Sequence, residues 1–154
     1  MAYRILLVLA FVLSLVGFFL PLHLYLNPRT GLGYNLGVVG SIMMAQLFIY
    51  SLKKRVKKTE WLPDLRHIFN YHIFLGIYGP LLILYHCGFH LGATNSNVAL
   101  FSMLIVSFSG FIGKFLYKRT GWEVPFKWWH VAHLPFVGLM LTAVTFHILA
   151  AFMY

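Results

Sequence analysis

Acidic residues and cysteine are scarce in this chain of 154 residues. Asp and Glu together occur three times, and charged residues of both signs make up only 10% of the sequence. Soluble globular domains carry about 25% charged residues, so the composition excludes an ordinary water-soluble domain. The single cysteine, Cys87, excludes an internal disulfide, and the absence of a C-x-x-C pair excludes the usual zinc and dithiol motifs.

Apolar residues are correspondingly abundant, at 60% hydrophobic and 18% aromatic, with a mean hydropathy of +0.80. A helix needs about 20 apolar residues to cross a hydrocarbon core of about 30 Å. The sequence therefore predicts a single domain over residues 1–154, an all-α integral membrane bundle of five transmembrane helices. The five apolar runs cover residues 5–26, 36–52, 68–91, 98–117 and 129–152.

Three local features near the ends of these runs need interpretation. Arg4 precedes the first run as in a signal peptide, but the run is too long and lacks a small-residue cleavage site, so we expect a retained helix. Residues 31–37, GLGYNLG, have the wrong glycine spacing for a dinucleotide-binding loop and follow a membrane helix, so we expect an outer turn. Asn97 is placed to cap the fourth helix.

Basic residues gather at one side of the predicted bundle. With a cytoplasmic N-terminus, only Arg29 lies outside, and eleven Lys and Arg residues lie inside: Arg4, Lys53, Lys54, Arg55, Lys57, Lys58, Arg66, Lys114, Lys118, Arg119 and Lys127. We expect a multi-pass protein of a bacterial inner membrane, with an extracytoplasmic C-terminus. The basic run 53–58 also suggests nucleic-acid binding, but orientation and anionic lipid already explain it. We therefore expect contact with membrane lipid and no nucleic acid.

Eight histidines are present, and four of them form two pairs with equal spacing. The eight are His23, His67, His72, His86, His90, His130, His133 and His147. His72 and His86 are 14 residues apart, and so are His133 and His147. Fourteen residues turn an α-helix to about 40° short of four full turns and rise about 21 Å. Each pair therefore faces one side of its helix at two depths, and ionisable residues inside a span are functional candidates.

The flanking charges place the two pairs at matching depths. His72 lies six residues after Arg66, and His133 lies six residues after Lys127. Since the third and fifth helices run the same way, His72 is level with His133, and His86 with His147. Two facing imidazoles at two levels are typical of two haems bound by axial ligation. We predict these four histidines as the cofactor-binding residues and ligands of the haem iron.

Other interpretations of the four histidines are weaker but remain open. Zinc usually needs four ligands that include Cys or carboxylate, and neither lies at these levels. Neutral histidines that only pack helices would make the chain a haem-free membrane anchor or assembly subunit of a larger redox complex. A quinol oxidase or ferric reductase with its own pocket near His90 or His23 is a further alternative. A transporter would normally need a buried carboxylate, which the spans lack.

The haem interpretation also predicts the type of haem and the roles of several residues near the histidines. No C-x-x-C-H motif occurs, so the haems should be b-type, and two axial imidazoles leave no open position, so no catalytic residue is predicted. Gly79 lies midway between His72 and His86, either to make room for two macrocycles or as part of a kink beside Pro80. Four further residues are interpreted as small-residue packing on the fourth helix: Ser107, Ser109, Gly110 and Gly113.

The remaining histidines fit the ligand pattern less well. His90 shares the face of His86 one turn further out, where it would contact a propionate or replace the outer ligand. His130 is 17 residues from His147 and about 100° off its face. His67 and His23 lie near the membrane interfaces, where a solvated histidine is expected.

These residues resemble the transmembrane cytochrome b domain of the ferric reductase and NADPH oxidase superfamily. That domain holds two stacked haems between two histidines on its third helix and two on its fifth. The matching stretches here are HIFLGIYGPLLILYH, residues 72–86, and HLPFVGLMLTAVTFH, residues 133–147. Together with residues 109–117 they look like the small bacterial members of the group, and the resemblance covers roughly residues 66–154.

The resemblance implies transmembrane electron transfer through two haem b groups. The inner haem would be held by His72 and His133 and would meet a cytoplasmic-side donor or a quinone. The outer haem would be held by His86 and His147 and would exchange electrons with an extracytoplasmic acceptor such as a c-type cytochrome or a metal ion. The chain departs from the reductases in lacking a flavin or nucleotide domain and a sixth helix. We therefore expect a separate redox partner, such as a flavoprotein or a larger complex.

Overall fold

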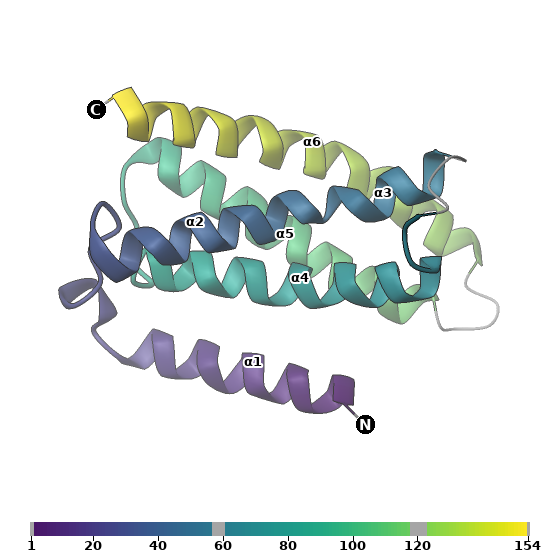
Figure 1. The fold of residues 1–154 in the computed structure, drawn as a ribbon, viewed down its shortest axis with the longest axis horizontal. Coiled ribbons are helices and arrows are strands. Elements are labelled where there is room, and N and C mark those ends of the chain that lie inside the picture. The colour runs from purple at the N-terminus through teal and green to yellow at the C-terminus, as the bar shows by residue number, and fades with distance from the viewer. Residues whose placement is uncertain (1, 57–60, 118–122, 154) are drawn as a thin grey trace. The chain divides into compact units, whose positions relative to one another are not determined.

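The computed structural model describes residues 2–56, 61–117 and 123–153 (Figure 1). All regular elements within these ranges are helices: α1 (Ala2–Phe19), η1 (Leu22–Leu24), α2 (Gly31–Gln46), α3 (Phe48–Arg55), α4 (Leu65–His86), α5 (Thr94–Tyr117) and α6 (Glu123–Met153). The prediction of an all-α chain with five apolar helical segments is confirmed. Four of the basic residues used to orient the chain lie outside the described residues: Lys57, Lys58, Lys118 and Arg119.

Four helical segments are long and apolar enough to cross a membrane. They are Gly31–Arg55, which combines α2 and α3, then Leu65–His86, Thr94–Lys114 and Lys127–Met153. The first predicted run, 5–26, was too long, because the apolar helix ends at Phe19. Pro21 explains this end, since proline has no N–H for the helix and disfavours helical geometry in the residue before it.

Two predictions about helix starts were wrong. The glycine-rich residues 31–37 form the first turns of α2 and not an outer turn. Only Gly31 has a positive φ, 61°, and a chain inside lipid gains by closing its backbone hydrogen bonds in a helix. Asn97 lies inside α5, which begins at Thr94. Its amide bonds the backbone of Gly92 in both directions, at 2.9 and 3.0 Å, and so ties the preceding loop to the helix.

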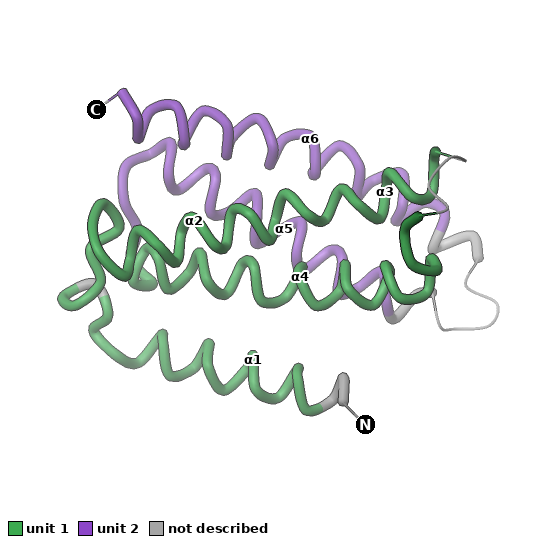
Figure 2. Tube along the Cα trace, in the orientation of Figure 1, with its two compact units in different colours: residues 1–90 green, residues 91–154 purple. Residues whose placement is uncertain are grey.

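The described helices form two compact units, residues 1–90 and 91–154 (Figure 2). In unit 1, helix α4 is central, because α1, α2 and α3 all contact it. Ile68, Leu75 and Leu81 of α4 are buried at 5% exposure or less. The histidines of α4 are therefore carried by the most enclosed helix of this unit.

Two tyrosine hydroxyls of α4 attach helix α1. Tyr78 donates to the carbonyl of Leu6 at 3.0 Å, and Tyr85 donates to the carbonyl of Leu13 at 2.8 Å. Donors and acceptors both recur every seven residues in the same order, so α1 and α4 run parallel (Figure 1). Beyond the end of α4, the chain turns through left-handed residues Gly88 and Phe89, with φ of 60° and 57°.

Close packing fixes Phe89 against α1 and α2 against α4. A Cβ atom added to Gly17 would lie 2.1 Å from the Phe89 ring. A Cβ added to Gly40 of α2 would lie 3.2 Å from the carbonyl oxygen of Gly79, and one added to Gly79 would lie 3.1 Å from Met44 Sδ. Gly79 thus allows α2 and α4 to pack closely. This role is additional to the two suggested by the sequence, which were room for two macrocycles and a kink beside Pro80.

Unit 2 is an antiparallel pair formed by α5 and α6. Gly113 of α5 makes room for the Trp129 ring of α6, since an added Cβ would lie 2.1 Å from that indole. The Trp129 Nε1 donates to the carbonyl of Ser109 at 2.8 Å. Small residues on α5 therefore allow the close contact that the sequence predicted.

Candidate functional site

The two histidines of α4 are held by hydrogen bonds to the neighbouring span. His72 Nδ1 lies 3.2 Å from the carbonyl oxygen of Leu47, and His86 Nδ1 lies 2.8 Å from that of Gly33. A carbonyl oxygen only accepts, so Nδ1 carries the proton in both bonds. In neutral imidazole the lone pair then belongs to Nε2. Both side chains are half-buried.

The acceptors of these two bonds repeat with the same spacing as the histidines. Gly33 and Leu47 are 14 residues apart, as are His72 and His86. Gly33 is in the first turn of α2, and Leu47 is the residue that separates α2 from α3. The helices are antiparallel neighbours, so equal spacing on both keeps the two imidazoles in equivalent positions about 21 Å apart.

Two further contacts shape the surroundings of the α4 histidines. A Cβ added to Gly37 of α2 would lie 2.5 Å from His86 Nδ1 and 2.8 Å from its Cε1, so the imidazole packs directly on the α2 backbone. The ring of Tyr50 lies 5.2 Å from that of His72. Each imidazole is thus oriented by packing as well as by its hydrogen bond.

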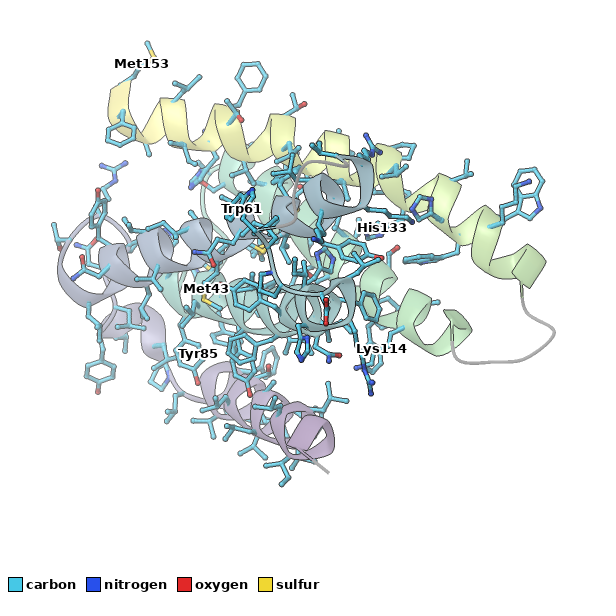
Figure 3. All side chains as sticks on the ribbon, turned by 45° about the vertical axis from the view of Figure 1, so that its right-hand side comes forward. Met43, Trp61, Tyr85, Lys114, His133 and Met153 are labelled. Atoms are coloured by element: carbon cyan, nitrogen blue, oxygen red, sulfur yellow. The ribbon has the colours of Figure 1, made fainter. Side chains whose placement is uncertain are left out.

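The two histidines of α6 also contact their neighbouring helix, α5, through Nδ1, but there the partners are serine hydroxyls. His133 Nδ1 lies 2.9 Å from Ser109 Oγ, and His147 Nδ1 lies 3.2 Å from Ser96 Oγ. The two serines are 13 residues apart, which nearly equals the spacing of the histidines. Figure 3 labels His133 on α6. In both units the ring nitrogen that contacts the neighbouring helix is Nδ1.

His133 has a second support from its own helix. The Trp129 ring, one turn earlier, stacks on the imidazole at 5.0 Å and 28°. Since Trp129 Nε1 also bonds the Ser109 carbonyl, Ser109 is contacted through its hydroxyl and its backbone by two consecutive turns of α6. The position of the His133 ring is therefore defined from two directions.

The other histidines are placed differently. His90 was predicted one turn beyond His86 on the same face, but α4 ends at His86 and the left-handed turn at Gly88 and Phe89 separates His90 from the helix. His67 is exposed. It lines a cavity of about 260 Å³ with Ile49, Leu62, Pro63, Ile68 and Tyr71. His130 contacts the Trp129 ring at 6.3 Å, and the side chain of His23 lies outside the described residues.

The four predicted ligands fall into two sets, one in each unit, and each set lies along one helix. Within the described ranges, no group of three or more His, Cys, Asp or Glu side chains is close enough to hold a metal ion.

No protein-family model, curated protein or solved structure matches this chain.

Sequence reasoning identified the histidines but missed what holds them. The acceptors at Leu47 and Gly33 are backbone carbonyl oxygens. Every residue type has such an oxygen, so the amino-acid sequence cannot identify which one is used. Ser109 was interpreted only as a small packing residue, and Ser96 lies just before the fourth predicted run, residues 98–117, and was given no role. The 13-residue spacing of these two serines, next to a 14-residue histidine spacing, was the available signal.

Proposed function

We propose that this chain is a membrane cytochrome b that carries electrons across the bilayer through two haem b groups. The observation that supports this most is the uniform use of Nδ1 by four histidines spaced 14 residues apart in pairs. Imidazoles that bind a metal through one nitrogen almost always engage the other in a hydrogen bond, which fixes the tautomer and ring orientation. The donor set therefore fits axial ligation through Nε2.

The pairing of the ligands follows from their depths in the sequence. His72 with His133 would hold the inner haem, and His86 with His147 would hold the outer haem. When bound, haem b supplies a one-electron redox centre. Two imidazoles at each level would leave the iron no open position for a substrate. The chain's own residues thus favour electron transfer over catalysis at the iron.

The partners proposed for this function follow from charge and resemblance. The basic residues Lys53, Lys54 and Arg55 end the second span, and Arg66 begins the next. The positive-inside rule makes this the cytoplasmic end, where a flavoprotein, a larger complex or a quinone would deliver electrons. The outer end would meet a c-type cytochrome or a metal ion. The resemblance to ferric reductases supports the same scheme in a bacterial inner membrane.

Haem content per chain tests the proposal. The full chain is purified in detergent, and a pyridine haemochrome assay is combined with a reduced-minus-oxidised spectrum. We expect two haem b per chain in the wild type and loss of at least one in His86→Ala and in His133→Ala. His67→Ala is the matched control, because it lies on α4 five residues before His72 and is exposed. It should keep both haems.

The alternative is a haem-free anchor or assembly subunit, favoured by the fact that the same hydrogen bonds join neighbouring helices. Histidine and serine side chains do stabilise helix pairs in membranes, by about 0.6 kcal/mol on average. If the chain is expressed with added hemin and is then purified as a folded, monodisperse protein without haem, this alternative is supported. Haem retained equally in all histidine variants would contradict ligation by these residues.

A further inference from the structure

We infer that Ser109 and Ser96 are positioning residues that each tune one of the two haems through the histidine they contact. Ser109 acts on His133 and therefore on the inner haem, and Ser96 acts on His147 and therefore on the outer haem. This inference rests on the proposed function and adds to it two residues that set the electron affinity of each centre.

The two units hold their histidines with chemically different groups. His72 and His86 face backbone carbonyl oxygens, whereas His133 and His147 face serine hydroxyls. A carbonyl oxygen only accepts a hydrogen bond, while a hydroxyl both donates and accepts. With the ligand pairs proposed from the sequence, each haem would take one carbonyl-held and one serine-held imidazole. The serine side is the one that a side-chain substitution can change.

The serine oxygens act as acceptors when the imidazole binds iron. Ligation through Nε2 leaves the proton on Nδ1, so Nδ1 donates to Oγ. At Ser96 the hydroxyl has its own acceptor, because Oγ lies 3.4 Å from the amide oxygen of Asn95. An acceptor at Nδ1 raises the basicity of a ligating imidazole. A more basic ligand favours oxidised iron, so loss of the acceptor should raise the midpoint potential.

The surroundings predict a larger effect at Ser109 than at Ser96. Ser109 is inside α5 and its backbone carbonyl accepts from Trp129, whose ring stacks on His133. Ser96 is in the first turn of α5, next to Asn95 in the exposed segment 91–95. Water can replace a lost hydroxyl beside the exposed segment 91–95, whereas the Ser109 hydroxyl lies beside the stacked Trp129 and His133 rings.

The experiment is a redox titration of the purified full chain, monitored optically and by the low-spin EPR signals of the two haems. Ser109→Ala should raise the potential of one haem, with a three- to tenfold larger reduced-to-oxidised ratio at a fixed potential. Tenfold corresponds to 59 mV for one electron. Ser96→Ala should raise the potential of the other haem by less. The EPR signal of the affected haem should shift with its potential.

Two variants separate positioning from general packing. Ser109→Thr keeps the hydroxyl and should restore the wild-type potential. Ser102→Ala is the matched control on the same helix, because the Ser102 hydroxyl bonds the carbonyl of Ala99 and no histidine. It should leave both potentials unchanged. If Ser109→Ala loses one haem while Ser109→Thr and Ser102→Ala keep both, the positioning role is also supported.

The result that overturns the inference is a wild-type haem content with both potentials and EPR signals unchanged in Ser109→Ala and Ser96→Ala. Equal shifts of both haems in each single variant would also overturn it, because the effect would then be global. A wild-type chain without haem would refute the proposed function itself. The two failures are therefore distinguishable.

Discussion

Gly37 offers a direct test of whether the position of His86 controls the proposed outer haem. A Cβ added to Gly37 would lie 2.5 Å from His86 Nδ1, 2.8 Å from Cε1 and 2.9 Å from Cγ. These distances are well below contact, so in Gly37→Ala the imidazole must move away from α2. The same movement stretches the 2.8 Å bond between Nδ1 and the Gly33 carbonyl.

The expected effect of Gly37→Ala on stability combines two unfavourable terms and one favourable term. Loss of the hydrogen bond costs about 0.5–1.5 kcal/mol, and overpacking of a well-filled site costs about 1–3 kcal/mol. Replacing glycine inside a helix returns about 0.5–1 kcal/mol. We expect a net destabilisation of about 0.5–4 kcal/mol, together with loss of one haem or a change in its spectrum.

The assay compares Gly37→Ala with Gly138→Ala in haem content, EPR and thermal unfolding in detergent. Gly138 of α6 is the matched control, because nothing lies within 4 Å of an added Cβ there. Gly138→Ala should keep two haems and equal or exceed the wild type in stability. If Gly37→Ala also keeps two haems with unchanged spectra and stability, the reasoning that links the α2 backbone to the orientation of His86 is refuted.

Three further predictions concern other contacts. Gly113→Ala should displace the Trp129 ring, since the added Cβ would lie 2.1–2.4 Å from the indole, and should quench or shift tryptophan fluorescence while perturbing one haem; an unchanged spectrum would contradict it. Tyr78→Phe and Tyr85→Phe should each lower the free energy of unfolding by about 1 kcal/mol and expose α1 to limited proteolysis; unchanged cleavage would contradict the attachment. Removing haem should lower the melting temperature, because a ligand at 100 times its Kd contributes about 2.7 kcal/mol; identical melting with and without haem would show that no binding occurs.

The sequence predicted the helical class well because long apolar runs are a strong signal of membrane helices. It predicted the ends of those runs poorly. Pro21 ended the first helix earlier than hydropathy suggested, and the glycine-rich residues 31–37 formed helix where soluble-protein rules favour a turn. In lipid, unpaired backbone groups are costly enough to override the weak helix propensity of glycine.

The sequence could predict only those parts of the candidate site that consist of distinctive side chains. The spacing of His72 and His86 was readable because helical periodicity links positions 14 apart. Their acceptors at Leu47 and Gly33 were not readable, since every residue has a carbonyl group and only the register of two helices selects one. Ser109 was visible as a residue but not as a partner of His133. Its role depends on the packing between α5 and α6.

The contact between Gly17 and Phe89 helps to determine the register of α1 along α4. The tyrosine hydroxyls bond carbonyl groups, and α1 offers a carbonyl at every position. Because Tyr78 and Tyr85 are seven residues apart, a slide of α1 by two turns would still give Tyr78 the carbonyl of Leu13. The Phe89 ring can sit this close to α1 only where a residue has no side chain. Gly17 therefore selects one register of α1 relative to α4, which the carbonyl groups of α1 alone would leave undetermined.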